Sequence, residues 1–208
     1  MGERFRTIVA DPPWHYAREE LWGRDNVEDH YPTLSVEQVA AMPIESFAAD
    51  DAYLWLWITA RHFEEGAHRP VCAGWGFTYR AWRVWGKPSI GMGYWLRYSH
   101  EVLVLATRGK VAPLSDLGSW FQESRDRHSR KPAGVYRDIE ERCPGPRLEL
   151  FARLPRPDQR DLLTDNPEWT VWGNEVGDPM GIGFDPENWE TTPPEQPSGA
   201  PQGAKRKP

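Results

Sequence analysis

The stretch from Ala52 to Ile58 limits the fold of this chain more than any other, because every residue in it is apolar or aromatic. A run of this length is typical of a β-strand that is buried on both faces. A shorter, largely apolar run from Thr7 to Ala10 predicts a second buried strand near the start of the chain. Strands of this kind need a covering layer on each side, so we expect a central sheet between two layers of helices.

Helix signals alternate with further strand patterns. Ser35 and Gln38 form a capping-box pattern that predicts a short helix through residue 42. Thr59 is placed to cap a second helix ending near residues 74–76, with a kink or an early end at Pro70. A third helix is predicted with Pro132 in its first turn. Further strands are expected at 77–86, 101–107, 147–151 and 169–172, with a long loop over 109–129. The fold class is therefore α/β, a three-layer sandwich.

Four residues after the first predicted strand carry the clearest chemistry: Asp11, Pro12, Pro13 and Trp14. In open α/β sheets, ligands bind just beyond the carboxyl ends of strands. Proline has no N–H group and a fixed φ, so the two prolines hold the stretch extended, with carbonyl oxygens able to accept hydrogen bonds. Asp11 adds a carboxylate acceptor, and Trp14 offers a flat ring on which a base could stack. The motif predicts a site for a planar amine; the alternative is a strand-ending turn with Trp14 in the core.

The composition favours one folded domain followed by a tail. A chain of 208 residues can bury a sizeable core. Residues 176–208 are rich in proline and glycine, so we expect a flexible tail after a domain that spans residues 1–175. The net charge of −6 argues against a protein that coats duplex nucleic acid by neutralising phosphates. A local basic face is still predicted, from Arg80, Arg83, Lys87, Arg97, Arg125, Arg127, Arg130 and Lys131.

Several classes of protein are not expected. Cys72 and Cys143 are too few and too far apart for a disulfide framework or a zinc motif, and the six histidines form no close ligand pair, so no metal is predicted. The sequence shows no signal peptide and no long apolar segment, which predicts a cytoplasmic protein without membrane contact.

Five motifs occur in a fixed order along the chain. They are Asp11-Pro12-Pro13-Trp14, Trp85-Gly86-Lys87-Pro88, His128-Ser129-Arg130-Lys131-Pro132, the run from Pro144 to Arg153, and Trp172-Gly173-Asn174-Glu175. In this order they resemble the DPPW-type adenine-N(6) methyltransferases, the family of the eukaryotic messenger-RNA adenosine methyltransferase catalytic subunit and its bacterial and phage relatives. The resemblance covers residues 8–175 and makes residues 1–175 a methyltransferase domain. It implies a Rossmann-like, S-adenosylmethionine-dependent methyltransferase fold with a permuted motif order.

The resemblance also implies roles for individual residues. Asp11 and the backbone of Pro12 would hold the adenine amine, while Pro13 shapes the loop and Trp14 lies against the base. Cofactor binding is implied for Lys131, Glu149, Phe151, Arg153, Asn174 and Glu175. Substrate contact is predicted for Tyr31, Lys87 and Arg130. Lys131 precedes a predicted helix, where a carboxylate ligand is favoured. The alternatives are a surface lysine at 131, a solvated strand residue at 149, a plain turn at 174–175 and simple packing of Tyr31.

The implied reaction is methyl transfer from S-adenosylmethionine to the N(6) amine of adenine in nucleic acid. The compact chain has no recognisable RNA-binding module, so DNA is the first choice of substrate and RNA the alternative. An alternative from another class is a non-catalytic nucleic-acid-binding or scaffold subunit, although the intact motif at 11–14 argues against it. The resemblance also hints at a homodimer or a heterodimer.

Overall fold

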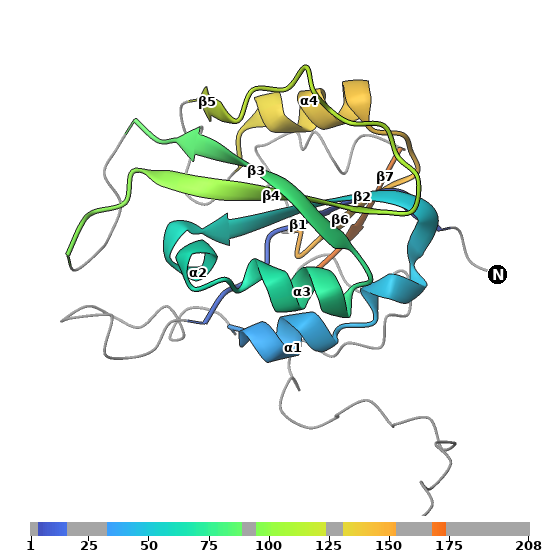
Figure 1. Cartoon of the computed structure of the whole chain (residues 1–208), viewed down its shortest axis with the longest axis horizontal. Coiled ribbons are helices and arrows are strands. Elements are labelled where there is room, and N and C mark those ends of the chain that lie inside the picture. The colour runs from blue at the N-terminus through green and yellow to red at the C-terminus, as the bar shows by residue number, and fades with distance from the viewer. Residues whose placement is uncertain (1–3, 16–32, 89–94, 124–130, 153–167, 174–208) are drawn as a thin grey trace, which may run out of the picture.

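The computed structural model describes residues 4–15, 33–88, 95–123, 131–152 and 168–173. These residues form a seven-stranded sheet with the order β5-β3-β4-β2-β1-β6-β7 (Figure 1). The strands are β1 (Phe5–Ala10), β2 (Ala48–Thr59), β3 (Thr78–Gly86), β4 (His100–Arg108), β5 (Trp120–Gln122), β6 (Arg147–Leu150) and β7 (Trp169–Trp172). The two apolar runs of the sequence are the neighbouring central strands β1 and β2. This confirms the prediction that both are buried.

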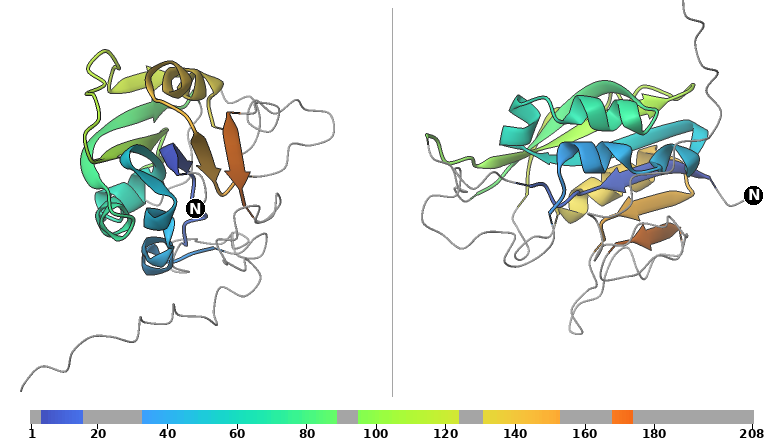
Figure 2. Two further views of the ribbon diagram at one scale, coloured as in Figure 1. Left: turned by 90° about the vertical axis from the view of Figure 1, so that its right-hand side faces the viewer. Right: turned by 90° about the horizontal axis from the view of Figure 1, so that it is seen from below.

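Strand direction decides which side chains meet at the functional end. β1 runs parallel to β2 and β6, and β6 runs parallel to β7, so the carboxyl ends of these strands lie at one end of the sheet. β4 is antiparallel to β2, and Glu101 near its start pairs with Thr59 at the end of β2. Figure 2 shows β6 and β7 side by side at one edge. The start of β4 thus lies beside the carboxyl ends of the parallel strands.

Helices cover both faces of the sheet and complete a three-layer α/β sandwich. α1 (Val36–Ala41), α2 (Ala60–Glu64) and α3 (His68–Gly74) lie on one face, and α4 (Ala133–Arg142) lies on the other (Figure 1). Ser35 and Gln38 form the predicted capping box of α1, and the Thr59 hydroxyl caps α2 by accepting from the backbone N–H of His62. Neither α4 nor any other helix in the described ranges is long and apolar enough to cross a membrane.

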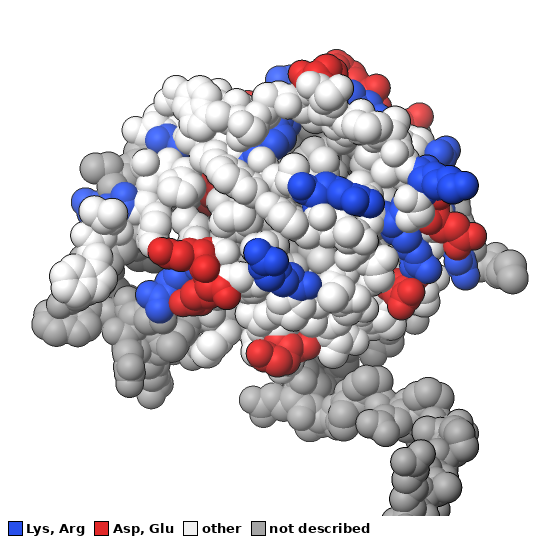
Figure 3. Space-filling view, in the orientation of Figure 1, with Lys and Arg blue, Asp and Glu red and all other residues white. Residues whose placement is uncertain are grey.

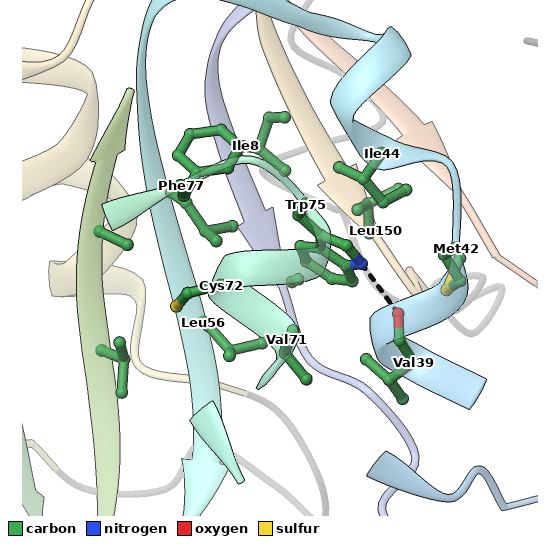
Figure 4. Close-up of a cluster of buried hydrophobic side chains, with 14 of the residues drawn as sticks. Ile8, Val39, Met42, Ile44, Leu56, Val71, Cys72, Trp75, Phe77 and Leu150 are labelled. Carbon is green, nitrogen blue, oxygen red and sulfur yellow. Dashed lines mark hydrogen bonds between the residues drawn. The ribbon is translucent and has the colours of Figure 1, made fainter. Parts of the chain in front are cut away.

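Each face of the sheet has its own hydrophobic core. The core beneath α1 and α3 includes Ile8, Leu56 and Trp75, all fully buried. Figure 4 shows Trp75 between the two helices, where its indole N–H donates to the carbonyl oxygen of Val39 at 2.8 Å. The core on the α4 face includes Trp55, Trp57 and Trp85 with Val135 and Ile139 of the helix. The chain has 12 tryptophans, and burial of large aromatic residues on both faces explains much of this high content.

Four details differ from the sequence predictions. The helix after Thr59 is interrupted at Gly66, whose φ of 80° is unfavourable for other residues, and not at Pro70, which lies in the first turn of α3. Pro132 is the N-cap of α4, one residue earlier than expected. The predicted loop at 109–129 contains the short strand β5, which pairs with β3. β6 is buried throughout instead of alternating.

Trp75→Phe should destabilise the protein by about 2 kcal/mol, because it leaves a small cavity and removes a buried hydrogen bond. The measurement is denaturant unfolding at neutral pH. Trp120→Phe is the control, since the Trp120 side chain is 61% exposed and its replacement should change stability by less than about 0.5 kcal/mol. Equal stability losses in the two variants would contradict the account of this core.

Candidate active site

The four residues Asp11, Pro12, Pro13 and Trp14, which we call the acceptor motif, meet Glu101 of β4 and Lys131 before α4 at the carboxyl end of β1. Asp11 directly follows β1, and its backbone N–H donates to the carbonyl oxygen of Leu150 at the end of β6. Glu101 lies near the start of the antiparallel strand β4. Lys131 comes directly before Pro132, the N-cap of α4. Strand order and direction, and not nearness in sequence, bring the three side chains together.

Lys131 joins two carboxylates. Its Nζ lies 2.8 Å from Oδ2 of Asp11 and 3.1 Å from Oε2 of Glu101. Lys87 pairs with the other carboxylate oxygen of Glu101. We call these four residues the ion cluster. Two tryptophans line it, since Nζ of Lys131 is 5.1 Å from the ring centre of Trp57 and Nζ of Lys87 is 5.1 Å from that of Trp85. Such cation–π contacts further hold the ammonium groups in place.

The ion cluster keeps Glu101 and Lys131 charged. Burial by itself would raise the pKa of Glu101, but the charges of Lys131 and Lys87 outweigh it and lower that pKa to about 2. Burial would lower the pKa of Lys131, yet Asp11 and Glu101 raise it above its usual value. Glu101 is therefore a carboxylate and Lys131 an ammonium at every pH at which an enzyme ordinarily works.

The acceptor motif is fixed by hydrogen bonds along its length. The carbonyl oxygen of Pro12 accepts from the backbone N–H of Trp14 at 2.9 Å, and that of Pro13 accepts from Leu34 at 2.7 Å. A carbonyl oxygen has two lone pairs, so the oxygen of Pro12 can accept a second hydrogen bond. Pro12 is buried, while Asp11 keeps about a third of its side chain exposed. A ligand can thus reach the carboxylate from solvent.

Trp14 does not offer the open stacking face that the sequence suggested. Its side chain is 5% exposed and belongs to the core beneath α1 and α3. Its indole N–H donates to the carbonyl oxygen of Trp57 at 3.2 Å. The alternative interpretation, in which Trp14 is a core residue, is the one that the structure supports. Trp14 anchors the motif instead of contacting a base.

The ends of β6 and β7 form the neighbouring wall. Phe151 follows β6 with a φ of 66°, which is rare for a bulky residue, and its ring lies edge-on to Trp172. Gly173 has no room for a side chain, because a Cβ there would lie 2.1 Å from the carbonyl oxygen of Ala152. Glu149 is 5% exposed and accepts from the hydroxyl of Tyr136 at 2.8 Å. The interpretation of Glu149 as a solvated strand residue is therefore wrong.

The predicted basic face is not a continuous cationic surface in the described part of the chain. Arg83 is buried and paired with Asp138 at 2.9 Å. Lys87 and Lys131 belong to the ion cluster, so the lysine at 131 is not a surface residue. On the face drawn in Figure 3, basic and acidic side chains are scattered among uncharged ones. Five predicted site residues lie outside the described residues: Tyr31, Arg130, Arg153, Asn174 and Glu175.

Glu101, which connects the two lysines, was not predicted from the sequence. The residue opens a predicted strand and belongs to none of the motifs. A charged residue at the start of an otherwise apolar strand was the available signal, but its partners depend on the antiparallel pairing of β4 with β2. Among the described residues, no cluster of three or more His, Cys, Asp or Glu could hold a metal ion.

The arrangement can hold an amine and a carboxylate side by side. Asp11 can accept hydrogen bonds from an amine, and Lys131 can pair with a carboxylate. Both groups stand at the carboxyl end of a parallel strand, the usual ligand site of doubly wound α/β proteins. The fold and the site thus define a Rossmann-like α/β protein with a polar binding site at the strand ends.

The comparisons with known proteins give the family. The MT-A70 family model matches residues 5–175, and the chain belongs to this family. It is 24% identical to the type II methyltransferase M.MunI of a Mycoplasma species, over 85% of this chain and 79% of that protein. It is 28% identical to the N(6)-adenosine-methyltransferase catalytic subunit METTL3 of Homo sapiens, over 83% of this chain and 28% of that protein.

A third relative is the N(6)-adenine-specific methyltransferase METTL4 of Mus musculus, 28% identical over 84% of this chain and 38% of that protein. The chain therefore spans most of the length of the bacterial relative but less than two fifths of METTL3 and METTL4. Family membership confirms the resemblance that the five ordered motifs carry and agrees with the observed α/β fold.

Glu101→Gln should lower the free energy of unfolding by about 3 kcal/mol at pH 7, because it leaves two buried ammonium groups short of a partner. The folded-state pKa of Glu101 lies below its usual value, so its stabilising effect is complete above about pH 4.5 and is lost as the pH falls toward 2. Between about pH 4.5 and pH 2, the variant should therefore lose less stability than the parent protein. Denaturant unfolding at several pH values measures both effects.

The control is Glu65→Gln, which removes an exposed carboxylate that pairs with Arg61 on α2. An exposed pair contributes less than about 1 kcal/mol, so this variant should stay close to the parent protein. If Glu101→Gln behaved like the control at pH 7, the ion cluster would not stabilise the fold.

Proposed function

We propose that this protein transfers a methyl group from S-adenosylmethionine to the N(6) amine of an adenine in nucleic acid. The observation that carries the proposal is the pairing of Asp11 with Lys131 at the carboxyl end of β1. It places an acceptor for an amine next to a cation for a carboxylate. The named functions of METTL3 and METTL4 are N(6) methylation of adenosine and adenine, which supports the same chemistry here.

Asp11 and Pro12 would bind the two hydrogens of the adenine amine. The amine is a weak nucleophile because its lone pair is delocalised into the ring. Hydrogen bonds to the Asp11 carboxylate and the Pro12 carbonyl oxygen would favour a tetrahedral nitrogen and fix the direction of its lone pair. Orientation of this kind supplies much of the rate enhancement in a group transfer between two bound molecules. The Asp11 carboxylate could also accept the proton that the nitrogen loses after methylation.

The donor set fits the amino-acid end of S-adenosylmethionine. Lys131 would hold the carboxylate of the cofactor, and Phe151 with the end of β6 would form the adjoining wall. When bound, the cofactor supplies an electrophilic methyl group on a positively charged sulfur. The carboxylate of Glu101 would stay beside Lys131 and complement the positive charges of such a ligand. Arg153, Asn174 and Glu175 remain predicted contacts for the ribose.

DNA is the favoured substrate. The chain matches 79% of the type II methyltransferase M.MunI, whereas it matches 28% of the adenosine methyltransferase METTL3. In a duplex, the target adenine would have to rotate out of the base stack before its amine could reach Asp11. Parallel assays of methyl transfer from radiolabelled cofactor to duplex DNA, single-stranded DNA and RNA distinguish the substrates. Tyr31 and Arg130 remain predicted substrate contacts, and a dimer and a cytoplasmic location remain predictions from the sequence.

Asp11→Ala should reduce methyl transfer by at least about a hundredfold, because the amine loses its charged acceptor. Cofactor affinity should change little, since Lys131 keeps Glu101 as its partner. Label transfer measures the first quantity and titration calorimetry the second. Asp50→Ala is the matched control, because the Asp50 side chain is 91% exposed and lies at the start of β2. Activity of Asp11→Ala at the level of this control would rule out the proposed role of Asp11.

A further inference from the structure

The chain that leaves the acceptor motif is held by a residue outside all five sequence motifs. His62 lies in α2 and is 7% exposed. Its Nε2 lies 2.9 Å from the carbonyl oxygen of His15, the residue that follows Trp14. A carbonyl oxygen can only accept, so Nε2 carries the hydrogen and donates it. The helix after β2 thereby grips the backbone directly beyond the motif.

Thr59 fixes the orientation of the His62 ring. Its hydroxyl lies 2.8 Å from Nδ1 of His62, and it also accepts from the backbone N–H of the same residue. In the neutral imidazole, the hydroxyl donates to Nδ1 and leaves the hydrogen on Nε2. The residue that caps α2 thus selects the tautomer that can bind His15.

The ring of His62 also packs against the motif. Its centre lies 5.3 Å from that of Trp14, at an interplanar angle of 31°. Trp14 is in turn bound to β2 through the carbonyl oxygen of Trp57. β2 and α2 therefore hold two consecutive residues of the acceptor segment, Trp14 by its side chain and His15 by its backbone.

Further hydrogen bonds connect His15 to Pro12 and Pro13, the part of the acceptor motif nearest to Asp11. His15 donates its backbone N–H to Leu34, and Leu34 donates its own to Pro13. The backbone N–H of Trp14 donates to the carbonyl oxygen of Pro12, the proposed acceptor of the amine. Because the two prolines have fixed φ angles, a displacement at His15 has few torsions in which to relax before it reaches Pro12.

We infer that His62 is a positioning residue for methyl transfer: its Nε2–H bond to His15 sets the placement of the Pro12 carbonyl and of Asp11. The inference rests on the proposed function, since its kinetic effect is an effect on that reaction. His62 contacts Thr59, His15 and Trp14, so its influence reaches Pro12 and Asp11 through the backbone of the acceptor motif.

Three variants separate the hydrogen bond from the packing. His62→Phe keeps a ring beside Trp14 but has no donor. His62→Gln places an amide nitrogen the same number of bonds from the backbone as Nε2 and can donate to His15. His68→Phe is the matched control, because His68 lies in the neighbouring helix α3, is 4% exposed and packs its ring against Phe63 and Tyr79.

The measurements are kcat, the KM of each substrate, the melting temperature, and amide hydrogen exchange in peptides that contain His15 and Leu34. His62→Phe should lower kcat at least about tenfold and leave the KM of the cofactor nearly unchanged, because only the acceptor half of the site moves. His62→Gln should restore kcat to within about threefold of the parent protein. Exchange of the His15 and Leu34 amides should accelerate in His62→Phe and not in His68→Phe.

Three results would overturn the inference: an unchanged kcat in His62→Phe, an equal loss in His62→Gln, or an equal loss in His68→Phe. The last would mean that any damage to a buried histidine lowers activity through stability. Failure of the proposed function looks different, because the unaltered protein would then methylate none of the nucleic acids. The exchange measurements would still report whether His62 holds the acceptor segment.

Discussion

The functional end of the sheet depends on the ammonium group of Lys131. It binds the carboxylate of Asp11 after β1 and that of Glu101 at the start of β4, and thus joins two strands between which β2 lies. Lys87 adds a second cation on the far side of Glu101, so the ion cluster has two positive and two negative groups. This balance allows charges to stay in a largely buried place, where an unpaired charge would be strongly destabilising.

A buried ion pair is seldom the most stabilising choice for a fold, so the ion cluster calls for a functional reason. Lys131 provides one, because its ammonium can exchange the carboxylate of Asp11 for that of a ligand. In the structure its partners are Asp11 and Glu101. In the proposed reaction it holds the cofactor carboxylate, keeps Glu101 and leaves the Asp11 carboxylate for the adenine amine. Sharing one lysine between the acceptor and the cofactor would couple the binding of the two.

The sequence predicts those parts of the fold and the site that depend on local pattern. The strand ending at Ala10, the capping box at Ser35 and the cap at Thr59 are confirmed, because each depends on residues close together in the chain. Glu101 was missed and Lys87 was assigned to a basic face and to substrate contact, since their pairing depends on strand order and antiparallel register. The pattern within one segment does not show which strands will become its neighbours in the sheet.

The burial of Trp14 also depends on tertiary structure and not on local pattern. An aromatic residue beside a proline turn fits both a stacking site and a core, and only the packing of α1, α2 and β2 around it decides between them. Hydrogen bonds with Trp57, His62 and Leu34 hold residues 13–15 in place, and they too form only in the tertiary structure. The acceptor motif supplies the reactive groups, and these three residues, which lie outside the sequence motifs, fix their geometry.

The most direct test of a shared lysine is the affinity of Lys131→Met for S-adenosylmethionine, measured by titration calorimetry beside Lys131→Arg. Methionine keeps the length of the side chain and removes the charge. The account predicts that Lys131→Met binds the cofactor at least about tenfold more weakly, the loss expected for a hydrogen bond to a charged group. Lys131→Arg should retain a larger part of the affinity. Cofactor binding by Lys131→Met at the strength of the unaltered protein would contradict the account.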